Sequence, residues 1–391
     1  MFNWRFLIFI KGGTRLIYLD NAATTGRKPP QVISAVNMAL QNYSANPGRS
    51  GHSLSVDTAM LVYDARKKIG DFFGCDASGV IFTGNCTLAL NMAIKGNIKQ
   101  GDHIIISSYE HNAVLRPVYK LALDGVAEFD VARVTVGDSD ATYRAFERLV
   151  KPNTKMIICT HASNVTGEIM PILRLSKLCK ENGIIFVVDA AQTAGIIPIN
   201  IKNSIDYLCV AAHKGLYAPM GTGILLTNKE PQDTLIEGGT GTFSNMFAQP
   251  KDMPERLESG TLSVPLIAGV KAGVEFLEQK GLKKIHSHEI SLLQILYDKL
   301  ASLPNVLLYT ERPTAEKFAP VLSFNLEGKN SMQVAEKLSQ KGIAVRAGLH
   351  CAPLAHKTIG TEDIGTVRVC PSIYNTKNDV LTLFNVIKSI K

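Results

Sequence analysis

One lysine and one aspartate, each placed just after an apolar run, are the residues of this chain best suited to chemistry. Lys214 lies in Ala-Ala-His-Lys-Gly-Leu-Tyr-Ala-Pro (residues 211–219), and Asp189 ends the run Val-Val-Asp that precedes Ala-Ala-Gln. A lysine amine can form a Schiff base with an aldehyde cofactor. An aspartate can pair with a pyridinium nitrogen and keep it protonated, so that the ring accepts electrons. The two residues together indicate a site for pyridoxal phosphate (PLP).

A second segment, Ile-Phe-Thr-Gly-Asn-Cys-Thr at residues 81–87, is typical of a phosphate-binding turn. It joins an expected strand to an expected helix. Free backbone N–H groups at the start of that helix, together with the Thr87 hydroxyl, form a cup for a phosphate group. A glycine-containing turn is in most proteins only a turn, and the phosphate interpretation gains its weight from the lysine and the aspartate.

Two more polar residues suit the same chemistry. His111, directly after Glu110, could stack on a pyridine ring and move protons between substrate and cofactor, with a helix-capping or buried histidine as the alternative. Arg368 lies near the end of an apolar run. An arginine binds a carboxylate through two parallel hydrogen bonds, which a lysine cannot reproduce. A surface arginine is the alternative at this position.

The chain has seven cysteines, with no CxxC pair and no spacing typical of a zinc site. Most lie in apolar runs, which indicates core thiols and a reducing compartment. Cys351 differs, because it lies in a loop between Gly348 and Pro353 and follows Arg346 and His350. Nearby positive groups favour the thiolate and so make a thiol nucleophilic. We therefore expect a nucleophile at Cys351, with an incidental loop thiol as the alternative.

Composition excludes several classes of function. The 42 Lys and Arg against 34 Asp and Glu give a net charge of +8, but the basic residues are scattered, so we expect no nucleic-acid partner. No apolar stretch approaches the roughly 20 residues of a membrane span, and residues 1–10 lack the pattern of a signal peptide, so we expect a cytoplasmic protein. His286 and His288 lie in a polar helical stretch, which favours a solvated helix face over a metal site.

Seven short, nearly continuous apolar runs predict strands that are buried on both faces. They lie at residues 80–83, 104–107, 131–136, 156–160, 184–188, 207–210 and 223–227. Helical patterns lie between several of them, at residues 88–98, 143–150 and 173–181. This alternation predicts an α/β fold with a mainly parallel, seven-stranded sheet covered on both sides. The step from 207–210 to 223–227 leaves no room for a crossover helix, so one strand should be antiparallel.

A smaller α+β domain is expected after this sheet. A helical region at about 266–303, with a break near Gly281, leads into four strands and two helices. The strands are expected at 306–308, 321–326, 343–346 and 367–370, and the helices at 331–341 and 378–390. We divide the chain into an N-terminal extension (1–17), a large cofactor-binding domain (18–265) and a small domain that carries the Cys351 loop (266–391).

The chemically useful residues follow the expected strands. Polar groups come directly after five of the seven, at residues 83–85, 110–111, 164, 189 and 213–214. Ligands of open α/β sheets bind outside the carboxyl ends of the strands. We therefore expect these groups to form one site at that edge of the sheet.

Taken together, these segments resemble the cysteine desulfurases, a group within the class V aminotransferase family of fold-type I PLP enzymes. The resemblance runs from Tyr-Leu-Asp-Asn-Ala-Ala-Thr-Thr at residues 18–25 to Ile-Tyr-Asn-Thr at residues 373–376, with six motifs in the family's order. The run Val-Arg-Ala-Gly-Leu-His-Cys-Ala-Pro-Leu-Ala-His at residues 345–356 resembles the SufS-like branch. The resemblance therefore implies the fold-type I architecture and L-cysteine as substrate.

The resemblance also implies roles around the cofactor ring. Lys214 is the Schiff-base lysine, Asp189 pairs with the pyridinium nitrogen and Gln192 contacts the phenolic oxygen. His111 stacks on the ring, and Asn164 lies near both substrate and cofactor.

Other implied contacts concern the phosphate and the substrate. The residues implied to face the phosphate are Asn85, Cys86, Thr87 and His213. Thr261 reaches the phosphate of the neighbouring subunit in a homodimer. Arg368 holds the substrate carboxylate, with Arg346 as a further substrate-binding residue, and Cys351 attacks the substrate sulfur.

The sequence departs from the family's pattern at three places. Ala211 stands where relatives often carry a phosphate-binding serine, and the phosphate turn has Asn-Cys-Thr in place of Gly-Thr-Thr. Backbone contacts remain at both, so we expect PLP to bind with altered affinity. Cys370-Pro371 is an unusual sequence after Arg368 and could shift that arginine.

We expect a homodimeric PLP-dependent cysteine desulfurase that converts L-cysteine to L-alanine and holds the sulfur on Cys351 as a persulfide. A sulfur-acceptor protein would then serve iron–sulfur clusters, thiolated RNA bases or selenium metabolism. The alternatives are selenocysteine lyase acting on L-selenocysteine, cystine lyase or transamination on the same scaffold, and a PLP-binding carrier or scaffold without turnover. A nucleotide-binding α/β protein is disfavoured, because no strand precedes a full GxGxxG or Walker loop.

Overall fold

The computed structural model describes residues 10–11, 14–48, 50–242 and 244–390. Most of the predicted N-terminal extension lies outside these residues. Within it, β1 (Ile10–Lys11) and β2 (Thr14–Arg15) form a short antiparallel pair. The chain then enters the folded body through β3 (Ile17–Tyr18), which pairs in parallel with β13 (Ile343–Ala344). The described segment that precedes residue 18 is thus tied to the C-terminal part of the chain.

A seven-stranded sheet forms the centre of the molecule, as predicted. Its order is β4-β10-β9-β8-β7-β5-β6, and every neighbouring pair from β9 to β6 is parallel. The strands are β4 (Val80–Thr83), β5 (Asp102–Ser107), β6 (Ala127–Ala132), β7 (Thr154–Thr160), β8 (Ile185–Asp189), β9 (Tyr207–Ala211) and β10 (Gly223–Thr227). The predicted antiparallel strand is β10, which runs opposite to both β9 and β4.

One predicted strand is wrong in position. We expected a strand at residues 131–136, whereas β6 covers Ala127–Ala132 and the chain leaves the sheet afterwards. The reason is that most residues of β6, which pairs only with β5, are exposed or only partly buried, so they need not be apolar on both faces. The valines at 131 and 136 that suggested the later strand are both exposed.

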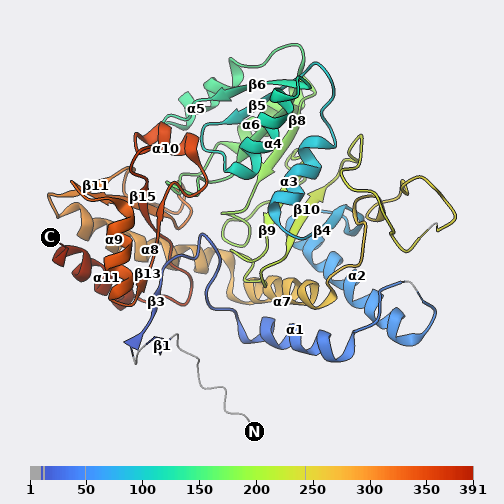
Figure 1. Cartoon of the computed structure of the whole chain (residues 1–391), viewed down its shortest axis with the longest axis horizontal. Coiled ribbons are helices and arrows are strands. Elements are labelled where there is room, and N and C mark those ends of the chain that lie inside the picture. The colour runs from blue at the N-terminus through green and yellow to red at the C-terminus, as the bar shows by residue number, and fades with distance from the viewer. Residues whose placement is uncertain (1–9, 12–13, 49, 243, 391) are drawn as a thin grey trace, which may run out of the picture.

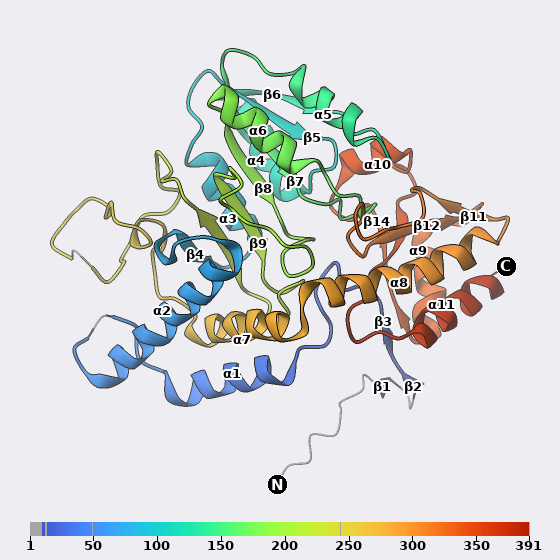
Figure 2. The same cartoon turned by 180° about the vertical axis from the view of Figure 1, so that it is seen from behind.

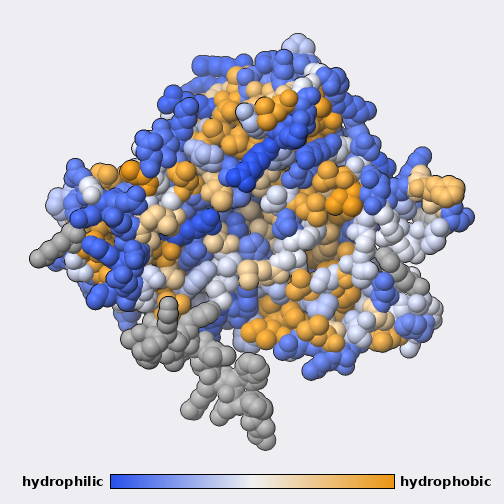
Figure 3. Space-filling model, in the orientation of Figure 1, coloured by the Kyte–Doolittle hydropathy of each residue, from blue (hydrophilic) through white to orange (hydrophobic). Residues whose placement is uncertain are grey.

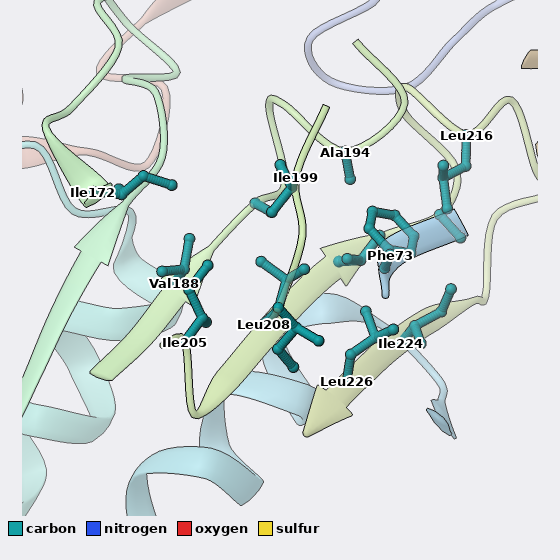
Figure 4. Packing of buried hydrophobic residues seen from close by; sticks show 14 of the residues in the cluster. Phe73, Ile172, Val188, Ala194, Ile199, Ile205, Leu208, Leu216, Ile224 and Leu226 are labelled. Atoms are coloured by element: carbon teal, nitrogen blue, oxygen red, sulfur yellow. The ribbon is translucent and has the colours of Figure 1, made fainter. Parts of the chain in front are cut away.

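Helices cover both faces of the sheet (Figure 1). The helices of this half are α1 (Pro30–Asn42), α2 (Ser53–Phe73), α3 (Cys86–Lys95), α4 (Asn112–Leu123), α5 (Ser139–Glu147), α6 (Ile172–Asn182) and α7 (Val264–Lys280). Val188, Leu208 and Leu226 point to the face covered by α2, α6 and α7 (Figure 4), and the alternate strand residues point to α3 and α4. Both faces of the sheet are therefore covered by helices and shielded from water.

The small domain is built on a four-stranded antiparallel sheet of order β11-β12-β15-β14. Its strands are β11 (Val306–Leu308), β12 (Leu322–Leu326), β14 (Arg346–Gly348) and β15 (Thr366–Val369), and its helices are α8 (Leu282–Ala301), α9 (Ser331–Gln340), α10 (Pro353–Ile359) and α11 (Lys377–Ser389). The predicted strand at 343–346 is two strands, because residue 344 pairs with β3 and residue 346 with β15.

The packing of α7 favours a division between the domains later than residue 265. Helix α7 lies against α1 and α2 (Figure 2), whereas α8 lies against α11 and β11. The helical break occurs at Gly281, as predicted, with a φ of 82° that a glycine adopts without strain. We therefore propose that the large domain extends to Gly281.

Helix α10 connects the two domains. Its N-cap Ala352 and its residue Ala355 belong to the buried cluster of the large domain, and the Thr358 hydroxyl donates a hydrogen bond to Ser108 Oγ at 2.9 Å. The segment that precedes α10 carries Cys351 and is therefore held close to the large domain. Among the described residues, no helix combines the length and the apolar character that crossing a membrane requires.

Candidate active site

Lys214 and Asp189 lie at the carboxyl ends of neighbouring strands. Asp189 is the last residue of β8 and is almost fully buried, and it accepts a hydrogen bond from the Ala191 N–H at 2.9 Å. Burial raises the pKa of its carboxyl, while the charge of Lys214 opposes that rise. Burial lowers the pKa of Lys214, and the nearby guanidinium of Arg368 lowers it further. A lysine with a lowered pKa has more of the neutral amine that a nucleophile needs.

The peptide that precedes Lys214 is held by the N-terminal segment. The His213 carbonyl accepts hydrogen bonds from four donors: the Thr24 hydroxyl, the Thr25 hydroxyl and N–H, and the Lys28 ammonium at 3.0 Å. Burial lowers the pKa of Lys28 to about 8. Sequence reasoning missed Lys28, because a lysine before two prolines carries no chemical pattern of its own. These bonds fix the backbone from which the Lys214 side chain extends.

The predicted phosphate turn is the N-terminus of α3. Asn85 is the N-cap and its side chain accepts the Leu88 N–H at 2.9 Å, so this residue contributes to the turn through helix capping. A Cβ atom on Gly223 of β10 would lie 2.2 Å from the Asn85 carbonyl carbon, so only glycine permits this close approach. Thr87 is exposed beside the free N–H groups.

Cys86 lies on the other side of this turn. Its buried thiol is 3.8 Å from Asp189 Oδ1, and that contact orients the side chain toward the aspartate. Its backbone N–H stays at the start of α3, where a phosphate contact needs no side chain. Cys86 therefore combines a backbone position at the turn with a side-chain contact to the aspartate.

His111 is the N-cap of α4 and also faces the site. Its Nδ1 accepts the Ala113 N–H at 3.0 Å, so Nε2 carries the ring proton. Burial lowers the pKa of His111 to about 4, with further lowering by the charges of Lys214, Arg346 and Arg368. The imidazole is therefore neutral at pH 7. The capping and the chemical interpretations of this histidine are compatible.

The Cys351 segment is an exposed loop with buried anchors. Cys351 is the exposed cysteine of the chain, and the other six are buried. Arg346 Nη2 lies 3.7 Å from its sulfur. The Asn112 N–H, directly after His111, donates to the Cys351 carbonyl at 2.7 Å. The thiol is thus accessible to a substrate or an acceptor and lies beside a cation and the His111 segment.

Arg368 is buried between the two domains. Its Nη2 forms an ion pair with Asp20 Oδ1 at 2.9 Å, and its Nη1 donates to the Asn164 carbonyl at 3.0 Å. Its Nε has no hydrogen-bond partner among the described residues although it is buried. A buried donor without an acceptor is costly, and a substrate carboxylate would supply the acceptor. The neighbouring Cys370 also lies in the interior, with its backbone paired to the Asp20 segment.

Two further predicted residues have contacts outside this group, although Gln192 lines one small cavity together with Lys214. Gln192 Nε2 donates to the Ala22 carbonyl at 3.1 Å, which ties it to the N-terminal segment. Thr261 is exposed shortly before α7. Its segment is fixed through Glu258, which forms a buried ion pair with Arg66 and accepts the Phe82 N–H of β4.

The two histidines predicted from the sequence to lie on a solvated helix face, and not at a metal site, are more buried than expected. His286 is buried and its Nε2 bonds the Phe318 carbonyl at 2.8 Å, so the expectation of a solvated helix face is wrong for this residue. His288 is half-buried and its Nε2 bonds the Asn375 carbonyl at 3.0 Å. Both rings have structural partners that the polar helical pattern did not indicate.

The residues present fit PLP. This cofactor requires a lysine with a lowered pKa, an acidic partner for the ring nitrogen and a place for its phosphate. The site provides the partly buried Lys214, the buried Asp189 and the capped start of α3, together with a neutral imidazole. His213 Nδ1 is buried without a hydrogen-bond partner in the described chain, which leaves it free for an added acceptor or donor. The chemistry of these groups is therefore suited to the cofactor.

A small cavity of about 20 Å³ lies behind Lys214 and reaches Glu289 of α8. Glu289 is buried, the Tyr217 hydroxyl donates to its Oε1 at 3.4 Å, and its Oε2 has no partner among the described residues. Burial raises the pKa of Glu289 to about 8. This carboxyl is therefore protonated in the folded protein at neutral pH.

Glu289→Gln should change how stability depends on pH. Between about pH 4.5 and 8 the unfolded chain has lost a proton that the folded Glu289 keeps, so rising pH destabilises the wild type relative to the variant. The free energy of unfolding of the variant minus that of the wild type should grow by at most about 1.4 kcal/mol per pH unit. Urea unfolding at several pH values between 5 and 8 measures it. A pH-independent difference would contradict a protonated Glu289.

Comparisons with known proteins agree on one family. The family model described as Aminotransferase class-V matches residues 17–383. A probable cysteine desulfurase of Pyrococcus abyssi is 33% identical over 96% of this chain and 94% of its own. The apo structure of a cysteine desulfurase from Thermococcus onnurineus superposes with a TM-score of 0.88 at 32% identity, over 96% of this chain and 94% of that one. A cysteine desulfurase from Escherichia coli gives a TM-score of 0.85 at 27% identity with the same coverage.

Proposed function

This chain belongs to the class V aminotransferase family, and we propose that it is a PLP-dependent cysteine desulfurase that converts L-cysteine to L-alanine. The observation that carries the proposal is the placement of Cys351. It is the exposed thiol, it lies 3.7 Å from Arg346, and its carbonyl is bonded to the residue after His111. A transaminase has no use for a nucleophilic thiol at this position, whereas sulfur transfer requires one.

Two residues and one helix N-terminus would hold the cofactor. Lys214 would bind it covalently, Asp189 would pair with the ring nitrogen, and the N-terminus of α3 would receive its phosphate. When bound, PLP supplies an electron-accepting ring that stabilises negative charge on an amino acid carbon. The buried Asp189 has a raised pKa in the protein alone, so the positive ring nitrogen is the partner that would favour its ionised form.

The chain's own groups would then perform the transfer. The Nε of Arg368 binds the carboxylate of L-cysteine, and the amine of Lys214, near the neutral His111, moves the Cα proton. The Cys351 thiolate attacks the substrate sulfur. An S–S bond forms, the C–S bond breaks, and its electron pair stays with the substrate carbon, which takes up protons to become alanine. Cys351 is left as a persulfide, ready for a thiol acceptor.

We also propose a homodimer in a reducing, cytoplasmic environment. Helices α1 and α2 expose large apolar side chains (Ile33, Met38, Leu40, Leu54, Val56, Met60 and Tyr63). Figure 3 shows apolar side chains gathered over α1. A second copy would cover them, and the exposed Thr261 is the residue proposed to reach the partner's phosphate site. The six buried cysteines are all free thiols, which suits a reducing compartment.

The test is alanine formation by the purified, PLP-loaded protein with L-cysteine, with and without a reductant. We expect alanine in both cases, with sustained turnover only when the reductant removes the sulfur. Mass spectrometry after cysteine treatment should find one added sulfur atom on the peptide that contains Cys351. A cofactor absorbance band without alanine, or alanine without sulfur on Cys351, would contradict the proposal.

A further inference from the structure

The backbone of the Cys351 loop is held in a costly conformation. His350 has a φ of 48° and Cys351 has a φ of 58°, so two consecutive residues with side chains are in the left-handed region. Side chains other than glycine rarely adopt this region, and each such residue costs free energy that surrounding contacts must offset. The loop therefore needs anchors to keep the thiol where it is.

One anchor is the side chain of Asn164, from the loop after β7 in the large domain. Its Nδ2 donates to the His350 carbonyl at 2.7 Å, and both residues are more than nine-tenths buried. The other bonds at this place are a backbone bond from Asn112 to Cys351 and the His350 ring on Thr366. Asn164 therefore provides the side-chain bond from the large domain to the strained peptide.

The backbone of Asn164 contacts the arginine that is proposed to bind the substrate. Its carbonyl accepts the Nη1 of Arg368 at 3.0 Å, and Arg368 is paired with Asp20. Asn164 thus lies between the arginine proposed to bind the substrate carboxylate and the loop that carries the thiol. The resemblance implied that Asn164 lies near substrate and cofactor, and the structure adds a hydrogen bond from its side-chain amide to the loop.

We propose that Asn164 is a positioning residue that holds the Cys351 loop in its strained conformation, so that the thiol meets the substrate sulfur. The proposal rests on the desulfurase function for its kinetic consequence, but the loop restraint itself does not depend on it. Without the amide, the buried His350 carbonyl loses a partner and the two left-handed residues are free to relax.

The experiment measures hydrogen exchange of the loop peptide, residues 346–353, in the full-length protein without cofactor. Asn164→Ala should exchange these amides about tenfold faster, as expected for the loss of one hydrogen bond to a buried carbonyl. Asn164→Asp is nearly isosteric and cannot donate from an ionised carboxylate, so it should act in the same way even if the alanine variant folds poorly. Leu349→Ala, an exposed loop side chain, is the matched control and should exchange like the wild type.

Kinetics of the PLP-loaded protein separate positioning from substrate contact. Both Asn164 variants should lower kcat for alanine formation by more than they lower the affinity for L-alanine, which is followed by the cofactor absorbance. Unchanged exchange in both variants, or a large loss of L-alanine affinity with unchanged exchange, would overturn the proposal. If the wild type makes no alanine, the desulfurase function fails while the exchange result still decides the restraint.

Discussion

Replacing Cys351 with alanine should reduce alanine formation from L-cysteine by roughly 10³-fold or more, because no other described cysteine can replace the nucleophile. The other six thiols are buried, and burial raises the pKa of Cys86, Cys159 and Cys209 well above the usual value. A buried thiol with a raised pKa provides almost no thiolate at neutral pH. Alanine and persulfide assays on the two proteins, loaded equally with PLP, measure the effect.

Two controls make this result specific. Cys351→Ser keeps the loop and the side-chain size, so a similar loss would exclude a structural explanation. Cys179→Ala removes a buried thiol of α6 and should keep most of the wild-type turnover. If Cys351→Ala retained turnover of L-selenocysteine or cystine, the alternative lyase activities on this scaffold would be favoured over desulfuration.

The sheet was predictable wherever strands are buried on both faces. Strand β4, at one edge of the sheet, and its neighbour β10 occupy the predicted residues 80–83 and 223–227, because every residue in them is buried and most are apolar. Strand β6, at the other edge, was misplaced for the opposite reason. Most of its residues are exposed or only partly buried. Apolar pattern therefore locates fully buried strands well and partly exposed strands poorly.

The domain boundary depended on packing that periodicity does not contain. Helix α7 has an apolar pattern that suits either domain, and only its position against α1 and α2 assigns it to the large one. The same holds for residues 17–18, whose pairing with Ile343 and Ala344 joins opposite ends of the chain. His286 is the opposite case. It lies in a stretch that is polar in sequence, yet in the structure it packs against the Phe318 segment and its ring bonds the Phe318 carbonyl.

The candidate site was predictable in its chemistry but not in its restraints. Asp189 ends a strand, Lys214 and His111 each come shortly after one, and a shared sheet edge brings such residues together. The partners that hold them come from distant segments. Asp20 pairs with Arg368 across 348 positions, and Lys28 bonds the carbonyl before Lys214 across 185. The only available signal for Asp20 was its place in the motif at residues 18–25, which gave it no role.

The restraints also explain why residues with opposite requirements coexist at this site. Arg368 must stay charged although it is buried, and Asp20 provides the opposing charge that lessens the lowering of its pKa by burial. Lys214 must instead lose its charge easily, and burial near Arg368 promotes that loss. In the proposed mechanism the same arginine would bind a carboxylate and favour a neutral amine, while Asp20 from the N-terminal segment holds the arginine in place.

Lys214→Met should separate function from stability. Turnover should fall by roughly 10³-fold or more, because no amine remains to bind the cofactor covalently or to move the Cα proton. The free energy of unfolding of the cofactor-free protein should not decrease. The wild-type ammonium sits where burial lowers its pKa, and methionine has a similar length without a charge to desolvate. Asp189, left without a neighbouring cation, should bind a proton, since burial already raises its pKa.

Alanine assays and urea unfolding of the cofactor-free proteins measure the two effects of Lys214→Met. Lys214→Arg is the matched control, since it keeps a charge that burial disfavours and should therefore be less stable than the methionine variant while being equally inactive. Activity within tenfold of the wild type in either variant would remove Lys214 from the proposed chemistry. A marked loss of stability in the methionine variant alone would instead mean that the lysine is charged and paired in the folded protein, so that the amine is released only when the cofactor binds.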